Sequence, residues 1–182
     1  MADTTQELAT ELVLCARYGE LEDLQALVAQ AGIAVRDAAL CRAQDGGPTP
    51  LHMAAANGHV AVLSYLLAGI HGPEDANVTN DEGSTPLHWA ALNGHAAAVE
   101  ALLARGARAT LKNKAGKSAV TVAAQADHVD VMDLLLKSYD PDEEEDGGDE
   151  ELPAGASVRV EDEDADADAG DEGEASGASL QR

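Results

Sequence analysis

The chain has 182 residues, the size of one ordinary domain with some additional chain, and a formal net charge of −23 from 34 acidic and 11 basic side chains. This acidity argues against direct binding of nucleic-acid phosphates by basic side chains, and it predicts a cationic or apolar partner. The chain has no Phe and only 2% aromatic residues, so Ala and Leu must build the core.

Four copies of one sequence pattern follow one another before residue 140. The first copy runs from Thr10 to Val28 and is degenerate. The second and third copies begin at Thr49 and Thr85 with TPLHMAAANGH and TPLHWAALNGH, and each is followed by an apolar stretch that ends on two leucines. The fourth copy begins at Ser118 and is again degenerate. The four starting residues are 39, 36 and 33 positions apart.

Each copy of the pattern predicts a pair of helices. Thr followed by Pro is a favourable helix start, because the hydroxyl can cap the helix and proline needs no N–H at that position. Gly58 and Gly94 then allow a left-handed turn before a second helix, and the fourth copy has Asp127 in this place. Such short helices are marginal alone, so the hairpins must stack on one another. We expect an all-α solenoid of four helical hairpins.

The remaining residues, 140–182, differ sharply in composition from the repeats. They hold 18 acids and 2 bases and few apolar residues, so we expect a disordered acidic tail. One interpretation is a solubilising segment. The other is a polyanion that competes for a basic client, beginning with the acidic run of Asp142, Glu143, Glu144, Glu145 and Asp146.

Several other sequence features argue against secretion, membrane insertion, metal binding and catalysis. The chain has no apolar run of membrane-spanning length and no signal-peptide pattern at Met1–Thr10, so we expect neither secretion nor membrane insertion. Cys15 and Cys41 form no metal-binding or disulfide pattern, and they favour a reducing intracellular compartment. Gly116-Lys117-Ser118 lacks the first glycine of a phosphate-binding loop. No catalytic set is visible, so we expect no metal, no cofactor and no enzymatic activity.

The TPLHxAAxxGH core, present twice, resembles the ankyrin repeat. The resemblance implies an ankyrin-repeat domain at residues 1–139, with the first and last repeats as caps. It also implies that His52 and His88 are structural residues that hydrogen-bond to neighbouring backbone. Against the usual 33-residue period, the first two spacings imply insertions near residues 31–44 and 69–78, which we expect to lengthen the loops.

In ankyrin repeats the loop tips and first helices line a concave face, and this implies the position of the binding site. We expect Trp89, with Met53 one repeat before it, to be an apolar anchor flanked by carboxylates that suits a cationic helix. The alternative is that Trp89 only packs between adjacent first helices. The candidate partner-binding residues are Arg17, Tyr18, Asp45, Met53, Asn57, Asp81, Glu82, Trp89, Leu92 and Asn93, and the same template adds Glu7, Pro48, Ala56, Ser84, Lys114, Lys117 and Gln125.

Finer details, above all Met53, Trp89 and the Tyr139-Asp140 junction with the acidic tail, resemble the fungal Yar-one type of ankyrin-repeat chaperone. This resemblance implies a dedicated escort that keeps a newly made small-subunit ribosomal protein soluble for assembly into pre-ribosomes. The client would be the basic KH-domain protein of the S-three family, held by its N-terminal helical segment.

The same resemblance implies a protein of the cytoplasm and nucleus, monomeric until client-bound, without direct contact to nucleic acid or membrane. The alternative function is a regulatory ankyrin adaptor that binds an enzyme or a transcription factor through the same concave face.

Overall fold

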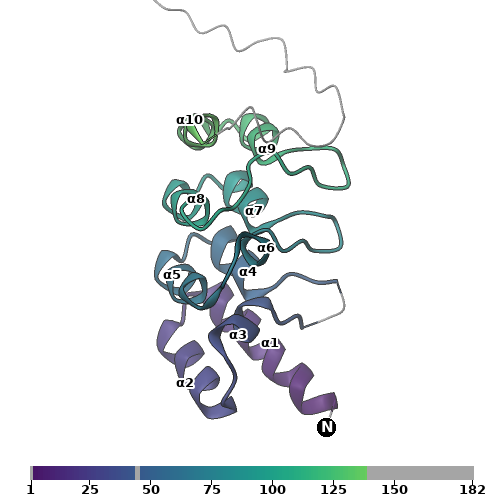
Figure 1. Ribbon diagram of the computed structural model, residues 1–182, viewed down its shortest axis with the longest axis vertical. Coiled ribbons are helices and arrows are strands. Elements are labelled where there is room, and N and C mark those ends of the chain that lie inside the picture. Colours follow the sequence, from purple (N-terminus) through teal and green to yellow (C-terminus); the bar gives the residue numbers. More distant parts are fainter. Residues whose placement is uncertain (1, 44–45, 139–182) are drawn as a thin grey trace, which may run out of the picture. The chain divides into compact units, whose positions relative to one another are not determined.

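The computed structural model describes residues 2–43 and 46–138, and the side chains from residue 5 onward. Over these residues the fold is all-α, as expected, and four helical hairpins follow one another (Figure 1). Their helices are α1 (Ala2–Tyr18) with α2 (Leu21–Ala31), α4 (Pro50–Ala56) with α5 (Val60–Gly69), α7 (Pro86–Leu92) with α8 (Ala96–Leu103), and α9 (Ala119–Gln125) with α10 (Val129–Lys137).

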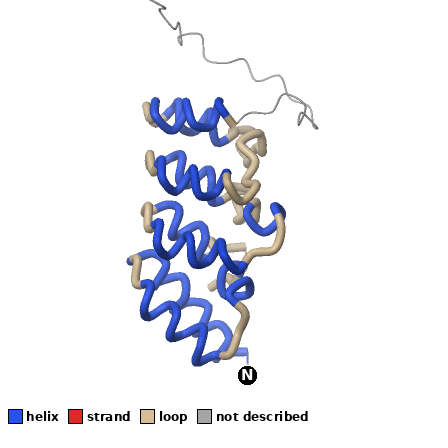
Figure 2. The backbone as a smooth tube through the Cα atoms, turned by 60° about the vertical axis from the view of Figure 1, so that its left-hand side comes forward, coloured by secondary structure: helices blue, strands red, loops and turns tan. Residues whose placement is uncertain are grey.

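The hairpins stack so that their helices form two layers. The first helices, α1, α4, α7 and α9, lie side by side in one layer, and each packs against the next. The second helices, α2, α5, α8 and α10, form the other layer, and the long loops project on the opposite side (Figures 1 and 2). Each hairpin therefore obtains its stability from its neighbours in the stack.

The repeat pattern determines where the central helices begin and turn. α4 and α7 start at Pro50 and Pro86, directly after the predicted N-cap threonines. Gly58 and Gly94 have φ angles of 68° and 73°, the left-handed conformation predicted for the turn. Asp127 adopts the same conformation at φ 58° and is the one described non-glycine residue with positive φ.

The first repeat departs from the pattern at its start. Thr10, which aligns with the two N-cap threonines, lies inside α1 rather than before it. No proline follows Thr10, so nothing prevents helical residues on its N-terminal side. Its hydroxyl donates instead to the carbonyl of Gln6 at 2.8 Å, one helical turn earlier. The first helix therefore has 17 residues, against seven in α4 and α7.

The two insertions fold into short helices, so the expectation that they only lengthen loops is wrong. α3 (Val35–Leu40) packs on α5, and α6 (Pro73–Ala76) lies in the next connection. Arg36 of α3 and Asp75 of α6 form a bidentate ion pair with N–O distances of 2.6 and 2.7 Å. The guanidinium of Arg36 lowers the pKa of Asp75. The ion pair ties one insertion to the other across a repeat.

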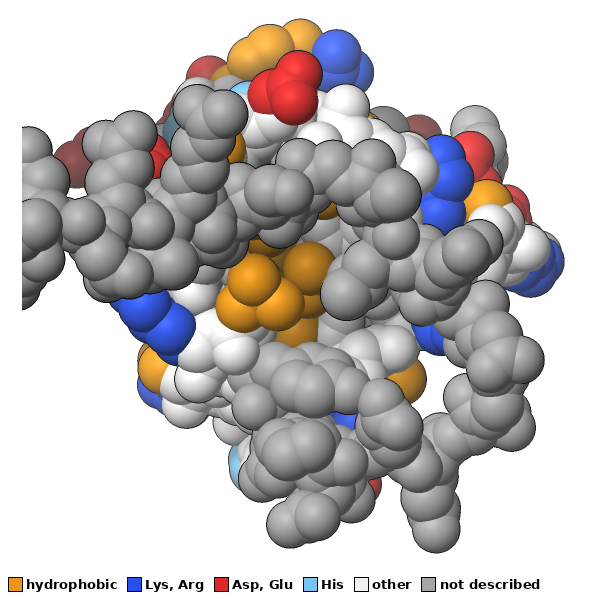
Figure 3. Space-filling model, turned by 90° about the horizontal axis from the view of Figure 1, so that it is seen from above, with side chains coloured by type: hydrophobic (Ala, Val, Ile, Leu, Met, Phe, Trp, Pro, Cys, Tyr) orange, Lys and Arg blue, Asp and Glu red, His pale blue; other side chains and the backbone are white. Residues whose placement is uncertain are grey.

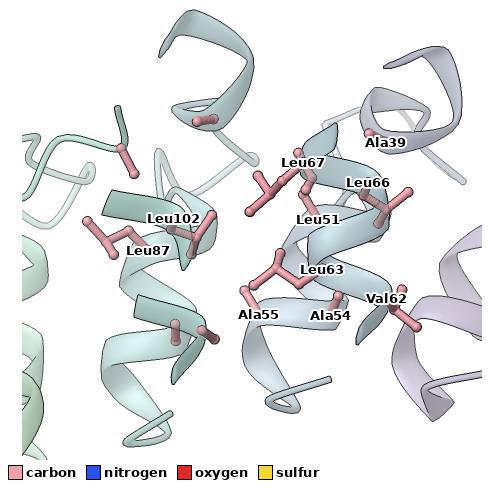
Figure 4. Packing of buried hydrophobic residues seen from close by; sticks show 14 of the residues in the cluster. Ala39, Leu51, Ala54, Ala55, Val62, Leu63, Leu66, Leu67, Leu87 and Leu102 are labelled. Atoms are coloured by element: carbon pink, nitrogen blue, oxygen red, sulfur yellow. The ribbon is translucent and has the colours of Figure 1, made fainter. Parts of the chain in front are cut away.

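The core confirms the composition argument, because its buried apolar side chains are Leu, Ala and Val with one Ile and one Cys. Leu51 of α4 and Leu63 and Leu67 of α5 fill the space between the two helices of a hairpin (Figure 4). Ala54 and Ala55 are fully buried on the side where the hairpins meet. Small side chains at these positions let neighbouring helices approach closely.

The end of the stack that carries α9 and α10 shows hydrophobic side chains on its surface (Figure 3). Val129 and Leu136 of α10 are 60% and 50% exposed. No described helix is both long and apolar enough to cross a lipid bilayer. The predicted acidic tail, including the run from Asp142 to Asp146, and the predicted domain boundary at Tyr139 lie outside the described residues and stay predictions.

Candidate functional site

An open groove of about 820 Å³ lies between the first helices and the loops. Its floor comes from the end of α1 and from α4, α7 and α9, and its side wall comes from the two loops that precede α7 and α9. The residues that line it are Arg17, Met53, Ala56, Asn57, Glu82, Ser84, His88, Trp89, Leu92, Asn93, Asn113, Lys117, Val122, Gln125 and Ala126. The groove spans residues from all four repeats, so the stack has to be intact for the site to exist.

Trp89 combines the two roles that the sequence left open. Its ring meets the His52 ring edge-on, with centroids 6.0 Å apart and planes at 76°, so it packs against the preceding repeat. The same side chain is half-buried and lines the groove beside Leu92, which is 53% exposed. Trp89 therefore presents apolar surface from a position that its neighbour holds in place.

Most of the predicted site residues come together, and three of the ten do not. Seven of them line the groove: Arg17, Met53, Asn57, Glu82, Trp89, Leu92 and Asn93. Tyr18 is 63% exposed and lies outside the groove lining, with its ring 5.9 Å from the Arg17 guanidinium. Asp81 is exposed and does not line the groove, and Asp45 lies outside the described residues. A partner-binding role for any of them stays a prediction.

Besides His88, which was expected only as a structural residue, three lining residues were not among the candidates, although a signal for two of them is in the sequence. Val122 and Ala126 come 33 positions after Trp89 and Asn93, so the repeat pattern places them on the same face. The third, Asn113, shapes the loop before α9, because its Oδ1 accepts from the N–H groups of Ala115 and Lys117 at 3.0 Å each. The pattern extends the groove into the last repeat.

The charge of the groove differs from the expectation that carboxylates flank Trp89. Glu82 is the one acidic side chain among the described lining residues, whereas Arg17 and Lys117 are both cationic. Lys117 Nζ donates to Gln125 Oε1 at 2.6 Å, so it is held at the last repeat. The described groove is apolar along its floor and of mixed charge at its edges.

The two histidines of the TPLH motif join each repeat to the next. The Nδ1 atom of His52 faces the backbone N–H of Thr49 at 3.2 Å, so Nδ1 must accept and Nε2 must carry the proton. Nε2 then donates to the carbonyl of Ser84 in the next repeat at 2.9 Å. His88 reaches the carbonyl of Lys117 in the same way at 3.0 Å. Burial lowers the pKa of His52 to about 4 and also lowers that of His88, so both rings are neutral near pH 7.

A second set of histidines joins the repeats in the opposite direction. Each lies directly before a second helix and contacts a backbone carbonyl of the preceding repeat through its Nε2 atom: His59 with Arg17 at 2.9 Å, His95 with Ala56 at 3.0 Å, and His128 with Leu92 at 3.1 Å. These five histidines thus have structural partners, as expected for His52 and His88. The described residues hold no group of His, Cys, Asp or Glu suited to a metal ion.

The loop tips also stack on one another through backbone hydrogen bonds. The Asp81 N–H donates to the carbonyl of Gly46 at 2.7 Å, and the Lys114 N–H donates to the carbonyl of Glu82 at 2.9 Å. Gly116, from the sequence that superficially resembles a phosphate-binding loop, closes a turn by donating to the Asn113 carbonyl at 2.9 Å. These contacts fix the loops of the side wall relative to one another.

Comparisons with known proteins agree with this geometry. Residues 12–113 and 68–146 match the family described as ankyrin repeats (3 copies). The chain is also similar to a chain in the crystal structure of the yeast ribosomal protein Rps3 in complex with its chaperone Yar1, with 32% identity and a TM-score of 0.68. That match covers 74% of this chain and 94% of the other, and it confirms the closer resemblance expected from the sequence. A search among curated proteins finds no match. The chain belongs to the ankyrin-repeat family.

Proposed function

We propose that this protein is an escort chaperone that binds a newly made ribosomal protein of the small subunit and keeps it soluble until it is assembled. The observation that carries the proposal is the similarity to a chain of the yeast complex between Rps3 and its chaperone Yar1, at 32% identity over 94% of that chain. The client is then the basic KH-domain protein of the S-three family, and its N-terminal helical segment occupies the groove.

The physical chemistry of the chain supports this function. A ribosomal protein outside the ribosome exposes basic surface that is meant for RNA, and a polyanion can cover this surface reversibly. The chain has a net charge of −23, and residues 140–182 supply 18 of its 34 acids. The groove itself offers Trp89, Met53 and Leu92 to apolar side chains of the client. We therefore assign apolar recognition to the groove and charge neutralisation to the acidic segment.

The protein acts by binding, without catalysis, metal or cofactor, since the ankyrin repeat is a scaffold for protein interactions. It travels with its client between cytoplasm and nucleus, as a monomer until it binds.

The first test is affinity capture of the tagged full-length chain from its own cells, with and without nuclease. We expect one small-subunit ribosomal protein in near-equal amount, and nuclease should not remove it. Recovery of an enzyme or a transcription factor, with ribosomal proteins absent or lost on nuclease treatment, would establish the regulatory-adaptor alternative instead.

The groove is tested with Trp89→Ala in a direct titration of the purified client. We expect about 30-fold weaker binding, the effect of losing one apolar hot spot. The unfolding temperature should also fall, because the ring packs against His52 of the preceding repeat, so the titration is made at a temperature where circular dichroism shows the variant to be folded. The matched control is Leu136→Ala, since Leu136 is similarly apolar and 50% exposed but does not line the groove. Equal affinities of the two variants would refute a role of the groove.

A chain that ends at Tyr139 tests the acidic segment separately. We expect weaker client binding at low salt, little change at high salt, and a less soluble client, because screened charges contribute less. Unchanged affinity and client solubility at low salt would reduce residues 140–182 to a segment that only keeps the protein itself soluble.

A further inference from the structure

One position of the repeat carries an apolar side chain in all four first helices. These side chains are Leu14 in α1, Met53 in α4, Trp89 in α7 and Val122 in α9. Leu14 is 41% exposed, and the other three are half-buried. Since α1, α4, α7 and α9 pack side by side in this order, the four side chains form one row along the stack. We call these four residues the apolar row.

The apolar row is longer than the groove described above. Met53, Trp89 and Val122 line the groove, whereas Leu14 extends the row onto the first repeat. The core uses this position only in part. Met53 packs against the core with its partly buried side, whereas the fully buried faces of α1 and α4 are formed by other residues, such as Leu12 and Leu51. The row therefore matches a partner that contacts all four repeats.

The spacing of the row selects the secondary structure of that partner. Packed helices lie about 8–10 Å apart, so consecutive members of the row are separated by roughly this distance. An α-helix rises 1.5 Å per residue, so two turns, or seven residues, advance about 10.5 Å, close to the upper end of one step, and return to the same helix face. A β-strand covers the step in about three residues, which places successive side chains on opposite faces. A helix fits the row, and a strand does not.

The charges beside the row add a second constraint. Arg17 lies beside the row in the first repeat, and Lys117, held by Gln125, lies beside it in the last. Glu82 lies on the loop before α7, in the middle of the groove. Charge complementarity then calls for an acidic side chain near each end of the bound helix and a basic one near its centre.

Two amide side chains lie next to the row. Asn57 and Asn93 each donate one N–H to the carbonyl of Met53 or Trp89 in the preceding helical turn, at 2.9 and 3.0 Å. This bond holds each amide in place, and its second N–H is open to a partner. The surface for specific recognition is therefore the apolar row, the two amides beside it and the charges along it.

We propose that the apolar row binds one amphipathic helix of the client, laid along the stack, with an apolar residue at every seventh position over about 22 residues. This inference rests on the proposed function and specifies which client segment the groove accepts. The basic side chains of the client lie mainly on the other faces of this helix and outside it.

The experiment compares two synthetic peptides of about 22 residues that have the same composition and helical content. One carries Leu at positions 1, 8, 15 and 22, with Glu near both ends and Lys at the centre. The other has its leucines moved to positions 1, 6, 12 and 17, so that no two of them are seven residues apart. We expect the first to bind the full chain about tenfold more tightly, because only its leucines all reach the row. Equal affinities would overturn the proposed spacing.

Disulfide trapping tests the direction of the helix on the same protein. Leu14→Cys and Val122→Cys variants are each mixed with the first peptide carrying Cys at position 1 or at position 22. We expect the two variants to trap opposite ends of the peptide, whereas wild type, in which Cys15 is buried and Cys41 is partly buried, should trap neither. Trapping of the same end by both variants would overturn an arrangement along the stack.

A client titration separates this inference from the proposed function. Leu14→Ala and Val122→Ala should each weaken client binding about fivefold, with Leu136→Ala as the unchanged control. If the ribosomal protein binds but neither row variant weakens it, the helix along the row is wrong and the chaperone function stands. If the peptide binds in register but the ribosomal protein does not, the client assignment is wrong and the apolar row stands.

Discussion

Acid should destabilise this fold through its buried histidines well before the carboxylates are protonated. His52 is fully buried, and burial lowers its pKa from 6.5 to about 4. The unfolded chain therefore binds a proton at this residue more readily than the folded chain does. The stability that depends on neutral His52 is complete above pH 6.5, and it is lost progressively as the pH falls from 6.5 towards 4.

The two pKa values of His52 give the magnitude of the effect. A difference of one unit corresponds to about 1.4 kcal/mol, so His52 alone accounts for about 3 kcal/mol between neutral pH and pH 4. Between pH 7 and pH 5.5, where most carboxylates stay ionised, the expected loss in the free energy of unfolding is about 1 kcal/mol. His88 adds a loss in the same direction, because its pKa is lowered as well.

Urea unfolding at pH 7 and pH 5.5, at constant ionic strength and followed by circular dichroism at 222 nm, measures this loss. His52→Gln should show a smaller pH dependence than wild type. His71→Gln should keep the wild-type pH dependence, because His71 is exposed and belongs to neither set of histidines that join the repeats. An NMR titration of the His52 ring in the wild-type chain provides a second measurement. A ring pKa near 6.5, or the same pH dependence in wild type and His52→Gln, would refute the reasoning.

Three further predictions concern the turns and the thiols. Gly58→Ala should lower the free energy of unfolding by about 2–3 kcal/mol, because φ is 68° and the new Cβ would lie 2.6 Å from His95 Nδ1. The control Gly32→Ala has a φ of 63° and no neighbour within 4 Å, so it should cost about 1 kcal/mol. Equal losses of the two variants in thermal unfolding would contradict the role of the histidine contact. Asp127→Gly should raise stability by about 1 kcal/mol, since it relieves a left-handed φ of 58°, and a lower unfolding temperature would be the opposite result. Burial raises the pKa of Cys41 to about 11. Alkylation of this thiol at pH 8, followed by mass spectrometry, should therefore be about 100-fold slower in the folded chain than in urea. A similar rate in both states would disprove the raised pKa.

The parts of the fold that the sequence predicts are those that repeat. TPLH places the starts of α4 and α7, and the glycines of the pattern place their turns, because these residues act on the backbone within a few positions of themselves. α3 and α6 have six and four residues, which is too short for a periodic pattern. The ion pair between Arg36 and Asp75 joins positions 39 apart, and no local signal indicates it.

The candidate site follows the same division. The repeat pattern places Met53, Trp89 and Asn93 on one face, and Val122, 33 positions after Trp89 in the degenerate last repeat, lies on the same face. The position of Asp81 outside the groove lining depends on how the loop tips stack, and the sequence pattern carries no information on that.

The histidine contacts between repeats have a consequence for how such proteins diversify. Each ring contacts a main-chain carbonyl of a neighbouring repeat, for example Ser84 or Ala56, and every amino acid offers the same carbonyl. The hydrogen bonds at these joints are therefore indifferent to the side chain of the residue that supplies the carbonyl. Groove residues that do not touch the histidine rings can be exchanged for others without weakening these joints, so one scaffold can acquire new binding specificities in small steps.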